Sequence, residues 1–197
     1  QGDERIALYE NQGEGTFEEK MLLCFPPSYG SSYFELADFD DDGQLDILYT
    51  CGDNADYSTV LKPYHGVYIF RNQGDLQFEQ TYFFPMNGAY RAIARDFDQD
   101  GDLDIAAVSF FADYTHRPEE GFVYLEHNGS FQFQASTLPI QELGRWITLD
   151  AGDLDQDGDL DLVLGNCSTA GGFDRTLDQQ WKEGSPYVIL ENTHIPS

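Results

Sequence analysis

The stretch DFDQDGDLD at residues 96–104 occurs twice more with the same spacing, as DFDDDGQLD at residues 38–46 and DLDQDGDLD at residues 153–161. We call these segments loop 1 (38–46), loop 2 (96–104) and loop 3 (153–161). Each has aspartate at positions 1, 3, 5 and 9 and glycine at position 6. Carboxylates this close together repel one another unless a cation neutralises them. Because the ligand atoms are oxygens and several are ionised, the pattern predicts calcium rather than zinc.

An EF-hand loop and an acidic turn without an ion are the alternatives to this interpretation. An EF-hand loop begins in the same way but needs a glutamate at position 12, where this chain has Tyr49, Ala107 and Leu164. The apolar runs that follow position 9 are typical of buried strands, which places the loops inside β-hairpins. An acidic turn without an ion accounts for one such loop more easily than for three of identical spacing.

The similarity between repeats extends beyond the loops. A strand pattern that ends in an Asn/Gly turn occurs at residues 5–13, 66–74, 121–129 and 185–192. A returning strand and a proline-containing link follow the first three of these segments, and a further strand then enters each loop. Asp38 and Asp96 are 58 positions apart, and Asp96 and Asp153 are 57 apart. Four strands per repeat of this length predict an all-β chain of propeller blades, each a four-stranded antiparallel sheet.

The acidic motif, the apolar strand after it and the Asn/Gly hairpin together resemble the FG-GAP or VCBS-type repeat of integrin α-like calcium-binding β-propellers. The resemblance covers essentially the whole chain. It implies that each loop joins the first two strands of a blade and holds one Ca²⁺, which gives three sites. By position, it implies ligands from the aspartates at positions 1, 3, 5 and 9 and from the backbone carbonyl at position 7. The implied residues are Asp38, Asp40, Asp42, Gln44, Asp46, Asp96, Asp98, Asp100, Asp102, Asp104, Asp153, Asp155, Asp157, Asp159 and Asp161.

The repeats divide residues 1–197 into one propeller segment. Residues 1–25 are expected to end a preceding blade, residues 31–85 and 89–139 to form two blades, and residues 145–197 to form an incomplete one. Propellers of this family usually have seven blades, so about three to three and a half are present. Because open sheet edges favour association, the rest of the ring is expected from the same chain or from another copy.

Composition limits the partners. The chain carries 36 acidic and 10 basic residues, for a formal net charge of −26. Such a surface argues against nucleic acid and against anionic membranes as partners. No apolar run approaches the ~20 residues that a membrane-spanning helix needs.

The long connections opposite the calcium loops are the expected ligand face. They comprise residues 52–65, 111–120 and 168–184, which differ in length and hold four of the chain's ten lysines and arginines together with several aromatic residues; Arg91 and Arg145 are expected nearby. Arginine beside exposed aromatics is typical of recognition surfaces. The alternative is that these side chains pack the connections onto the sheets. The candidates are Tyr57, Tyr114, Arg117, Arg145, Trp146, Arg175 and Trp181.

These features predict a non-enzymatic, calcium-stabilised module that binds a protein or glycan or takes part in assembly. Because such loops fill where calcium is abundant, the expected location is extracellular, at a cell surface or periplasmic. No nucleophile, zinc-protease or phosphate-loop motif occurs. Two alternatives remain: a propeller domain of a secreted polysaccharide lyase or hydrolase, and a purely architectural subunit of a larger complex.

Overall fold

Thirteen strands make up about half of the computed structural model, which describes residues 3–53, 60–167 and 175–193, without the side chains of residues 175 and 176. The strands are β1 (Glu4–Gly13), β2 (Thr16–Phe25), β3 (Ser31–Ala37), β4 (Asp46–Cys51), β5 (Gly66–Asn72), β6 (Phe78–Pro85), β7 (Ala89–Arg95), β8 (Asp104–Ser109), β9 (Phe122–His127), β10 (Phe133–Ser136), β11 (Trp146–Gly152), β12 (Asp161–Asn166) and β13 (Tyr187–Leu190). Helix α1 (Arg175–Glu183) and the short 3-10 helix η2 (Pro118–Gly121) complete the described elements.

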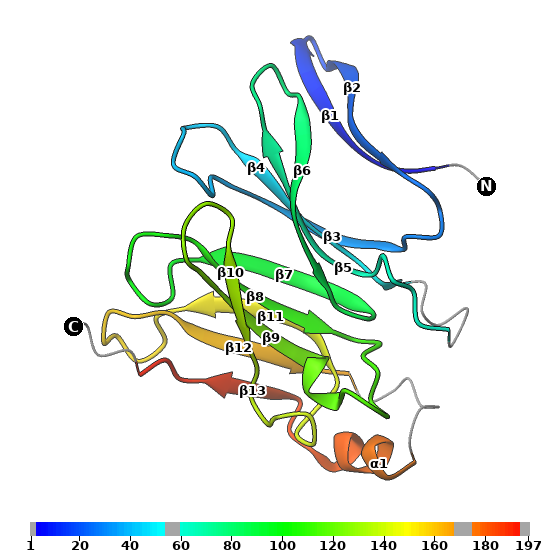
Figure 1. Cartoon of the computed structure of the whole chain (residues 1–197), viewed down its shortest axis with the longest axis vertical. Coiled ribbons are helices and arrows are strands. Elements are labelled where there is room, and N and C mark those ends of the chain that lie inside the picture. The colour runs from blue at the N-terminus through cyan, green and yellow to red at the C-terminus, as the bar shows by residue number, and fades with distance from the viewer. Residues whose placement is uncertain (1–2, 54–59, 168–174, 194–197) are drawn as a thin grey trace.

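The strands form four antiparallel sheets in chain order (Figure 1). The first blade is β3–β4–β5–β6 and the second is β7–β8–β9–β10, and in each the sequential strands are hydrogen-bonded neighbours. The third blade has three described strands, β11–β12–β13, and β1 and β2 form a hairpin of their own. These sheets confirm the predicted all-β propeller architecture.

The first strands of the three blades lie next to one another. Strand β3 contacts β7, and β7 contacts β11. Each later strand of a blade is therefore farther from this shared inner edge, as expected for blades arranged around an axis.

The second strand of each complete blade is buried on both faces. In β4, Ile47 and Tyr49 pack toward Phe25 of the hairpin, whereas Leu48 packs toward the second blade. In β8, Ile105 faces the first blade and Ala106 faces the third. Because side chains alternate across a strand, a continuous apolar run suits a strand with a sheet on either side.

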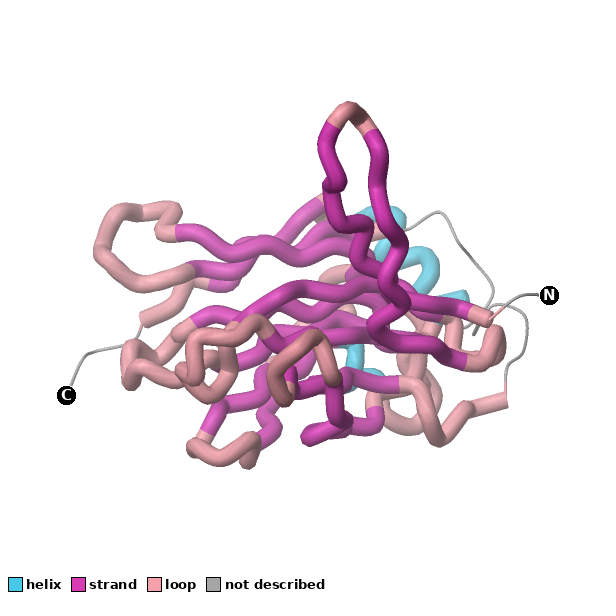
Figure 2. The backbone as a smooth tube through the Cα atoms, turned by 90° about the horizontal axis from the view of Figure 1, so that it is seen from above, coloured by secondary structure: helices cyan, strands magenta, loops and turns pink. Residues whose placement is uncertain are grey.

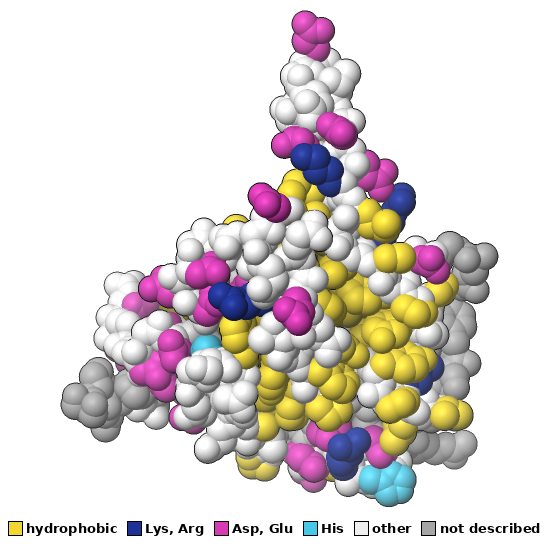
Figure 3. Space-filling model, turned by 45° about the horizontal axis from the view of Figure 1, so that its top comes forward, with side chains coloured by type: hydrophobic (Ala, Val, Ile, Leu, Met, Phe, Trp, Pro, Cys, Tyr) yellow, Lys and Arg dark blue, Asp and Glu magenta, His cyan; other side chains and the backbone are white. Residues whose placement is uncertain are grey.

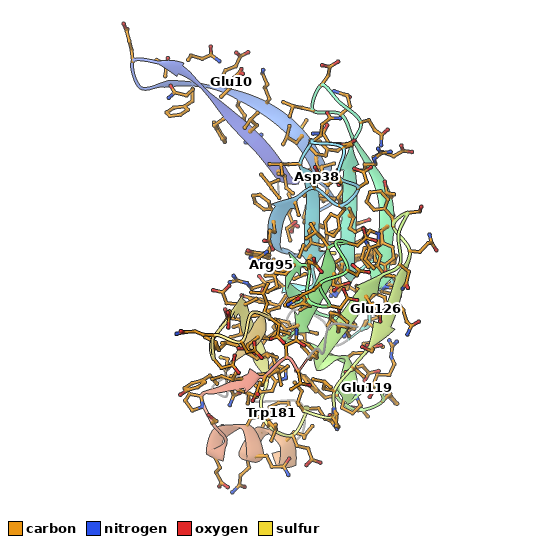
Figure 4. The ribbon with its side chains drawn as sticks, turned by 90° about the vertical axis from the view of Figure 1, so that its left-hand side faces the viewer. Glu10, Asp38, Arg95, Glu119, Glu126 and Trp181 are labelled. Atoms are coloured by element: carbon orange, nitrogen blue, oxygen red, sulfur yellow. The ribbon has the colours of Figure 1, made fainter. Side chains whose placement is uncertain are left out.

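The hairpin β1–β2 projects from the stack of blades (Figure 2), and Glu10, labelled in Figure 4, marks it. Its base packs on the first blade through Ile6 and Phe25, but Tyr9, Phe17 and Met21 farther out are exposed. Hydrophobic side chains also gather on the molecular surface below the hairpin (Figure 3). The hairpin thus has apolar surface that no described residue covers.

Two of the connections at the other end of the blades contain a helix. The structure places η2 at the end of the connection at residues 111–120 and α1 within the connection at residues 168–184. Leu177 and Trp181 are four residues apart on α1 and pack together against Ala112 and Tyr114. None of the described helices is both long and apolar enough to cross a membrane.

Candidate metal centres

All three acidic loops occupy the same place in their blades. Loop 1 joins β3 to β4, loop 2 joins β7 to β8 and loop 3 joins β11 to β12. They lie along one side of the molecule, on the left in Figure 1, whereas α1 lies at the lower right. From the loop side, Asp38 of loop 1 is seen above Arg95, which directly precedes loop 2 (Figure 4).

Two backbone positions give the loops a common shape. Position 4 is left-handed in each loop, with φ of 55° at Asp41, 60° at Gln99 and 68° at Gln156. Position 6 is left-handed as well, with φ of 84°, 102° and 103° at the glycines of loops 1, 2 and 3. Glycine takes this conformation without the strain that a Cβ atom would add. The left-handed backbone at position 6 therefore explains why all three loops have glycine there.

The aspartate at position 1 organises the turn. Asp38 accepts hydrogen bonds from the backbone N–H groups of Asp42 (3.2 Å) and Gly43 (2.8 Å). Asp96 accepts the equivalent pair, at 3.1 and 3.2 Å. In loop 3, Asp153 instead accepts from the backbone N–H of Gln156 at 2.7 Å. A carboxylate that accepts backbone hydrogen bonds holds the loop closed around it.

The aspartate at position 9 fastens each loop to the third strand of its blade. Asp46 accepts from the backbone N–H of Phe39 at 3.1 Å and of Asn72 at 2.8 Å. Asp104 accepts from Phe97 and His127, at 3.2 and 2.8 Å.

Loop 3 repeats this arrangement, since Asp161 accepts from Leu154 at 3.0 Å and from Asn192 at 2.9 Å. All three position 9 side chains are buried. Sequence reasoning assigned position 9 to calcium and missed this second role. A sequence signal for this second role is that Asn72, His127 and Asn192 occupy equivalent positions in the three repeats.

Burial makes two of these carboxylates, Asp46 and Asp104, costly to ionise. Burial raises the pKa of Asp46 above its ordinary value, against hydrogen bonds from Asn72 and Phe39 that lower it. Burial also raises the pKa of Asp104, although the hydroxyl of Tyr124 donates to it at 2.6 Å. A nearby cation would favour the charged form of both groups.

Carboxylates converge in every loop, but not the same ones. Oxygens within 4.8 Å of one another come from Asp96, Asp98 and Asp100 in loop 2 and from the same positions, 1, 3 and 5, in loop 3. In loop 1 the converging group is Asp38, Asp40 and Asp46, at positions 1, 3 and 9. Of the predicted side-chain ligands, positions 1 and 3 thus meet in all three loops, position 5 in two and position 9 in one.

The donor atoms fit calcium. Each converging set consists of carboxylate oxygens alone, which is the chemistry that Ca²⁺ prefers. Two buried oxygens, Asp40 Oδ1 and Asp159 Oδ1, have no hydrogen-bond partner among the described residues. Burial, followed by the charge of Asp157, raises the pKa of Asp159. An uncompensated carboxylate oxygen in each of these loops is consistent with a cation ligand.

Apolar residues at positions 2 and 8 anchor the loops between blades. Phe39 lies in the core between the first and second blades, and Phe97 lies in the core between the second and third. Leu103 and Leu160 pack on the same two cores from the following loop. Leu154, which occupies position 2 of loop 3 as Phe39 and Phe97 do in the other loops, is exposed. The loops therefore connect neighbouring blades as well as turning the chain.

An arginine side chain from a neighbouring strand contacts the aspartates of loop 1. The Nε atom of Arg71, in β5, lies 2.5 Å from Asp40 Oδ2, and its Nη2 atom lies 3.2 Å from Asp42 Oδ2. In the parts of the chain that the structure describes, no lysine or arginine forms an ion pair with an aspartate of loop 2 or loop 3. Sequence analysis did not single out Arg71.

The expected ligand face requires a correction, because four of its seven residues are buried: Tyr114, Arg145, Trp146 and Trp181. The ring of Trp181 packs against Tyr114 with centroids 4.9 Å apart, and its Nε1 donates to Gln141 O at 2.9 Å. Trp146 lies in the core between the second and third blades. The alternative considered from the sequence, in which these residues pack the connections onto the sheets, is the one that the structure shows.

Arg145 is buried for a specific reason. Its guanidinium carbon lies 3.6 Å from the centroid of the Phe110 ring, and its Nε donates to Phe110 O at 2.8 Å. Burial lowers its pKa. The arginine that sequence reasoning placed on a recognition surface thus joins the third blade to the end of β8.

Of the other three candidates, Arg117 is half exposed and pairs with Glu120 at 2.6 Å. Tyr57 and the side chain of Arg175 lie outside the described residues. Arg117 is the one candidate among the described side chains that remains available to a partner.

Comparison with known proteins agrees with the repeats and the loops. The profile of the FG-GAP-like repeat family matches residues 1–49 and 96–164, and the second range includes all of loops 2 and 3. The chain is also 27% identical over 166 residues to cartilage acidic protein 1 of Mus musculus. That alignment covers 80% of this chain and 24% of the relative, so the chain spans about a quarter of the relative's length. Because the family profile matches more than half of its residues, this chain belongs to the FG-GAP-like repeat family.

Proposed function

We propose that this chain is a calcium-stabilised propeller module that works outside the cytoplasm as a non-enzymatic scaffold for protein or glycan binding. In this proposal each loop holds one Ca²⁺ through converging aspartates and the carbonyl at position 7. The ion neutralises the loop carboxylates and fixes the ends of the first two strands. Each loop contains five of the chain's 36 acidic residues. Because each Ca²⁺ carries two positive charges, three bound ions would change the formal net charge from −26 to −20.

One observation carries the calcium assignment. Aspartates at positions 1, 3 and 5 converge within 4.8 Å in both loop 2 and loop 3, on backbones with the same pair of left-handed residues. Without a cation, three carboxylates at this distance oppose the fold that brings them together. Two loops in different repeats thus bring their carboxylates together in the same unfavourable way, which supports binding of the same kind of ion in each.

Calorimetric titration of the decalcified chain with CaCl₂ tests this assignment. We expect binding at up to three sites, and weaker binding of MgCl₂, because magnesium requires a smaller octahedral shell and keeps its waters. Asp98→Asn and Asp155→Asn should each remove one site. Absence of calcium binding, or tighter binding of magnesium, would contradict the proposal.

The interaction part of the proposal rests on exposed surface. Tyr9, Phe17 and Met21 on the hairpin are exposed, as are Phe34 and Leu36 on the inner strand β3. Several large apolar side chains exposed on these strands favour a contact with another protein surface. We propose that these strands meet the rest of a propeller, from the same chain or another copy, while the face that includes Arg117 is left for a partner.

An assay of assembly tests this second part. Phe17→Ser with Met21→Ser should reduce self-association or association with further propeller repeats, as measured by sedimentation in calcium. The control is Glu10→Gln with Glu18→Gln, which replaces two residues of the same hairpin that are already polar and should leave association intact. Equal behaviour of the two double variants would contradict an apolar contact through the hairpin.

A further inference from the structure

We propose that Arg71 acts as an internal cation for loop 1, so that loop 1 binds calcium more weakly than loops 2 and 3. This inference rests on the proposed calcium function and goes further by dividing the three sites into two classes. It assigns to Arg71, a residue outside the acidic motif, control over the affinity of one site.

The first argument is the position of the guanidinium. Arg71 contacts Asp40 at position 3 and Asp42 at position 5 simultaneously, at 2.5 and 3.2 Å. In loops 2 and 3 the aspartates at these two positions belong to the converging groups. The guanidinium thus contacts oxygens that a calcium ion would use, and a positive charge there repels an entering ion.

The second argument is the altered geometry of loop 1. At position 5, the Oδ1 atoms of Asp42, Asp100 and Asp157 accept the same backbone hydrogen bond from position 7, at 2.9, 2.8 and 3.2 Å. Asp100 and Asp157 nevertheless belong to the converging groups of loops 2 and 3, whereas the group of loop 1 comprises positions 1, 3 and 9. In loop 1 the second oxygen of Asp42 pairs with Arg71 instead.

The third argument is what the other repeats have in the place of Arg71. The backbone N–H groups of Asn72, His127 and Asn192 donate to position 9 of loops 1, 2 and 3. The residue before each donor is therefore structurally equivalent, and these residues are Arg71, Glu126 and Glu191. Loops 2 and 3 thus have an acidic residue where loop 1 has a cation.

The surroundings extend this contrast. Glu126 and Glu191 line one cavity of about 540 Å³ together with Asp98 of loop 2. Arg71 lines a different groove, of about 720 Å³, with Asp38 and Asp40 of loop 1 and Asp102 of loop 2. Carboxylates around Asp98 increase the attraction for a cation, and the guanidinium in the groove at loop 1 decreases it.

Calorimetric titration of the full decalcified chain with CaCl₂ tests the inference. We expect two sites of similar affinity and a third at least about tenfold weaker, since a tenfold change in Kd corresponds to 1.4 kcal/mol. Asp40→Asn should remove the weak site, and Asp98→Asn should remove one of the tight sites. Arg71→Gln should strengthen the weak site by about tenfold or more, toward the affinity of the other two.

Two further variants control for the charge and for the loss of an ion pair. Arg71→Lys keeps the positive charge and should keep the weak site. Arg5→Gln breaks a comparable surface pair, between Arg5 and Glu19 at 3.1 Å on the hairpin, and should change no affinity. Circular dichroism at saturating calcium establishes that each variant is folded.

The failures of the two proposals are distinguishable. Three equal sites in the original chain, with none altered by Arg71→Gln, would overturn the role of Arg71 and leave the calcium function standing. No binding at any loop would overturn the calcium function itself. If Arg71→Gln does not fold, Glu126→Arg provides the converse test, because it should weaken one tight site about tenfold. An unchanged tight site in Glu126→Arg would contradict the inference.

Discussion

Asp46, Asp104 and Asp161 fasten their loops to the third strand through backbone hydrogen bonds that require no metal ion. The aspartates at positions 1 and 5 also accept backbone hydrogen bonds, but from residues of their own loop. Position 9 differs at the scale of single residues because it also accepts from a residue outside the loop. The aspartate at position 9 holds two backbone segments together in any case.

Asp104→Asn should therefore destabilise the chain even in chelator. The amide nitrogen would face a backbone N–H donor, either from Phe97 or from His127, and leave it unsatisfied, at a cost of about 1–3 kcal/mol. Urea unfolding in chelator measures this loss. Asp102→Asn, at the less buried position 7, is the matched control and should have a small effect. Equal stability of Asp104→Asn and the original chain in chelator would refute the structural role.

His65 gives a pH dependence of known sign. Burial, with a smaller contribution from Lys62, lowers the pKa of His65 to about 4. The unfolded value is near 6.5. Because the folded value is the lower one, neutral His65 contributes stability above pH 6.5 that is lost as the pH falls toward 4.

Between pH 7.5 and 4.5 this loss should be roughly 2–3 kcal/mol. The measurement is the free energy of unfolding of the original chain and of His65→Gln, side by side in saturating calcium. The variant should depend less on pH over this interval by about that amount. Parallel pH profiles would show that His65 does not titrate as its burial requires.

At the scale of elements, helix α1 shows how an aromatic residue in a variable connection can be structural. Trp181 packs on Tyr114, donates to Gln141 and, through its carbonyl, accepts a hydrogen bond from Asn166 at 2.9 Å. These contacts join α1 to the second and third blades. In the sequence, Trp181 stands beside charged residues. Because binding surfaces and amphipathic helices both have this composition, the sequence alone does not distinguish them.

Trp181→Ala should detach α1 while leaving the calcium loops intact. Truncation of a buried tryptophan costs about 3–5 kcal/mol. Hydrogen exchange should show faster exchange at the α1 amides, and calcium titration should show unchanged affinities. Lys182→Ala changes the exposed neighbouring residue and is the control. Protection of α1 in Trp181→Ala equal to that in the control would contradict the anchoring role.

Some elements could be predicted from the sequence and others could not. The loops and blades could be predicted because one physical requirement is repeated three times, so that spacing and strand alternation are visible directly. The burial of Arg145 between Phe110 and Phe111 could not, because it depends on where two segments about 35 positions apart meet. The same holds for Arg71, whose importance appears only when β5 is placed beside loop 1.

At the scale of the whole molecule, the loops connect the blades. Phe39 and Phe97 insert into the cores between neighbouring blades, so the shape of each loop affects two sheets. If calcium fixes the loops, its removal should loosen the contacts between blades as well as the loops themselves. The central claim, that calcium stabilises the entire fold, follows from this connection.

Thermal unfolding of the chain with saturating calcium and with excess chelator tests this claim most directly. A ligand that binds only the folded state contributes about 2.7 kcal/mol per site at a hundredfold excess over Kd. For a chain of this size, about 1 kcal/mol corresponds to roughly 2–4 °C in Tm. With two tight sites, we therefore predict that chelator lowers Tm by roughly 10 °C or more and that added calcium, but not magnesium at the same concentration, restores it. An unchanged Tm in chelator would contradict the account.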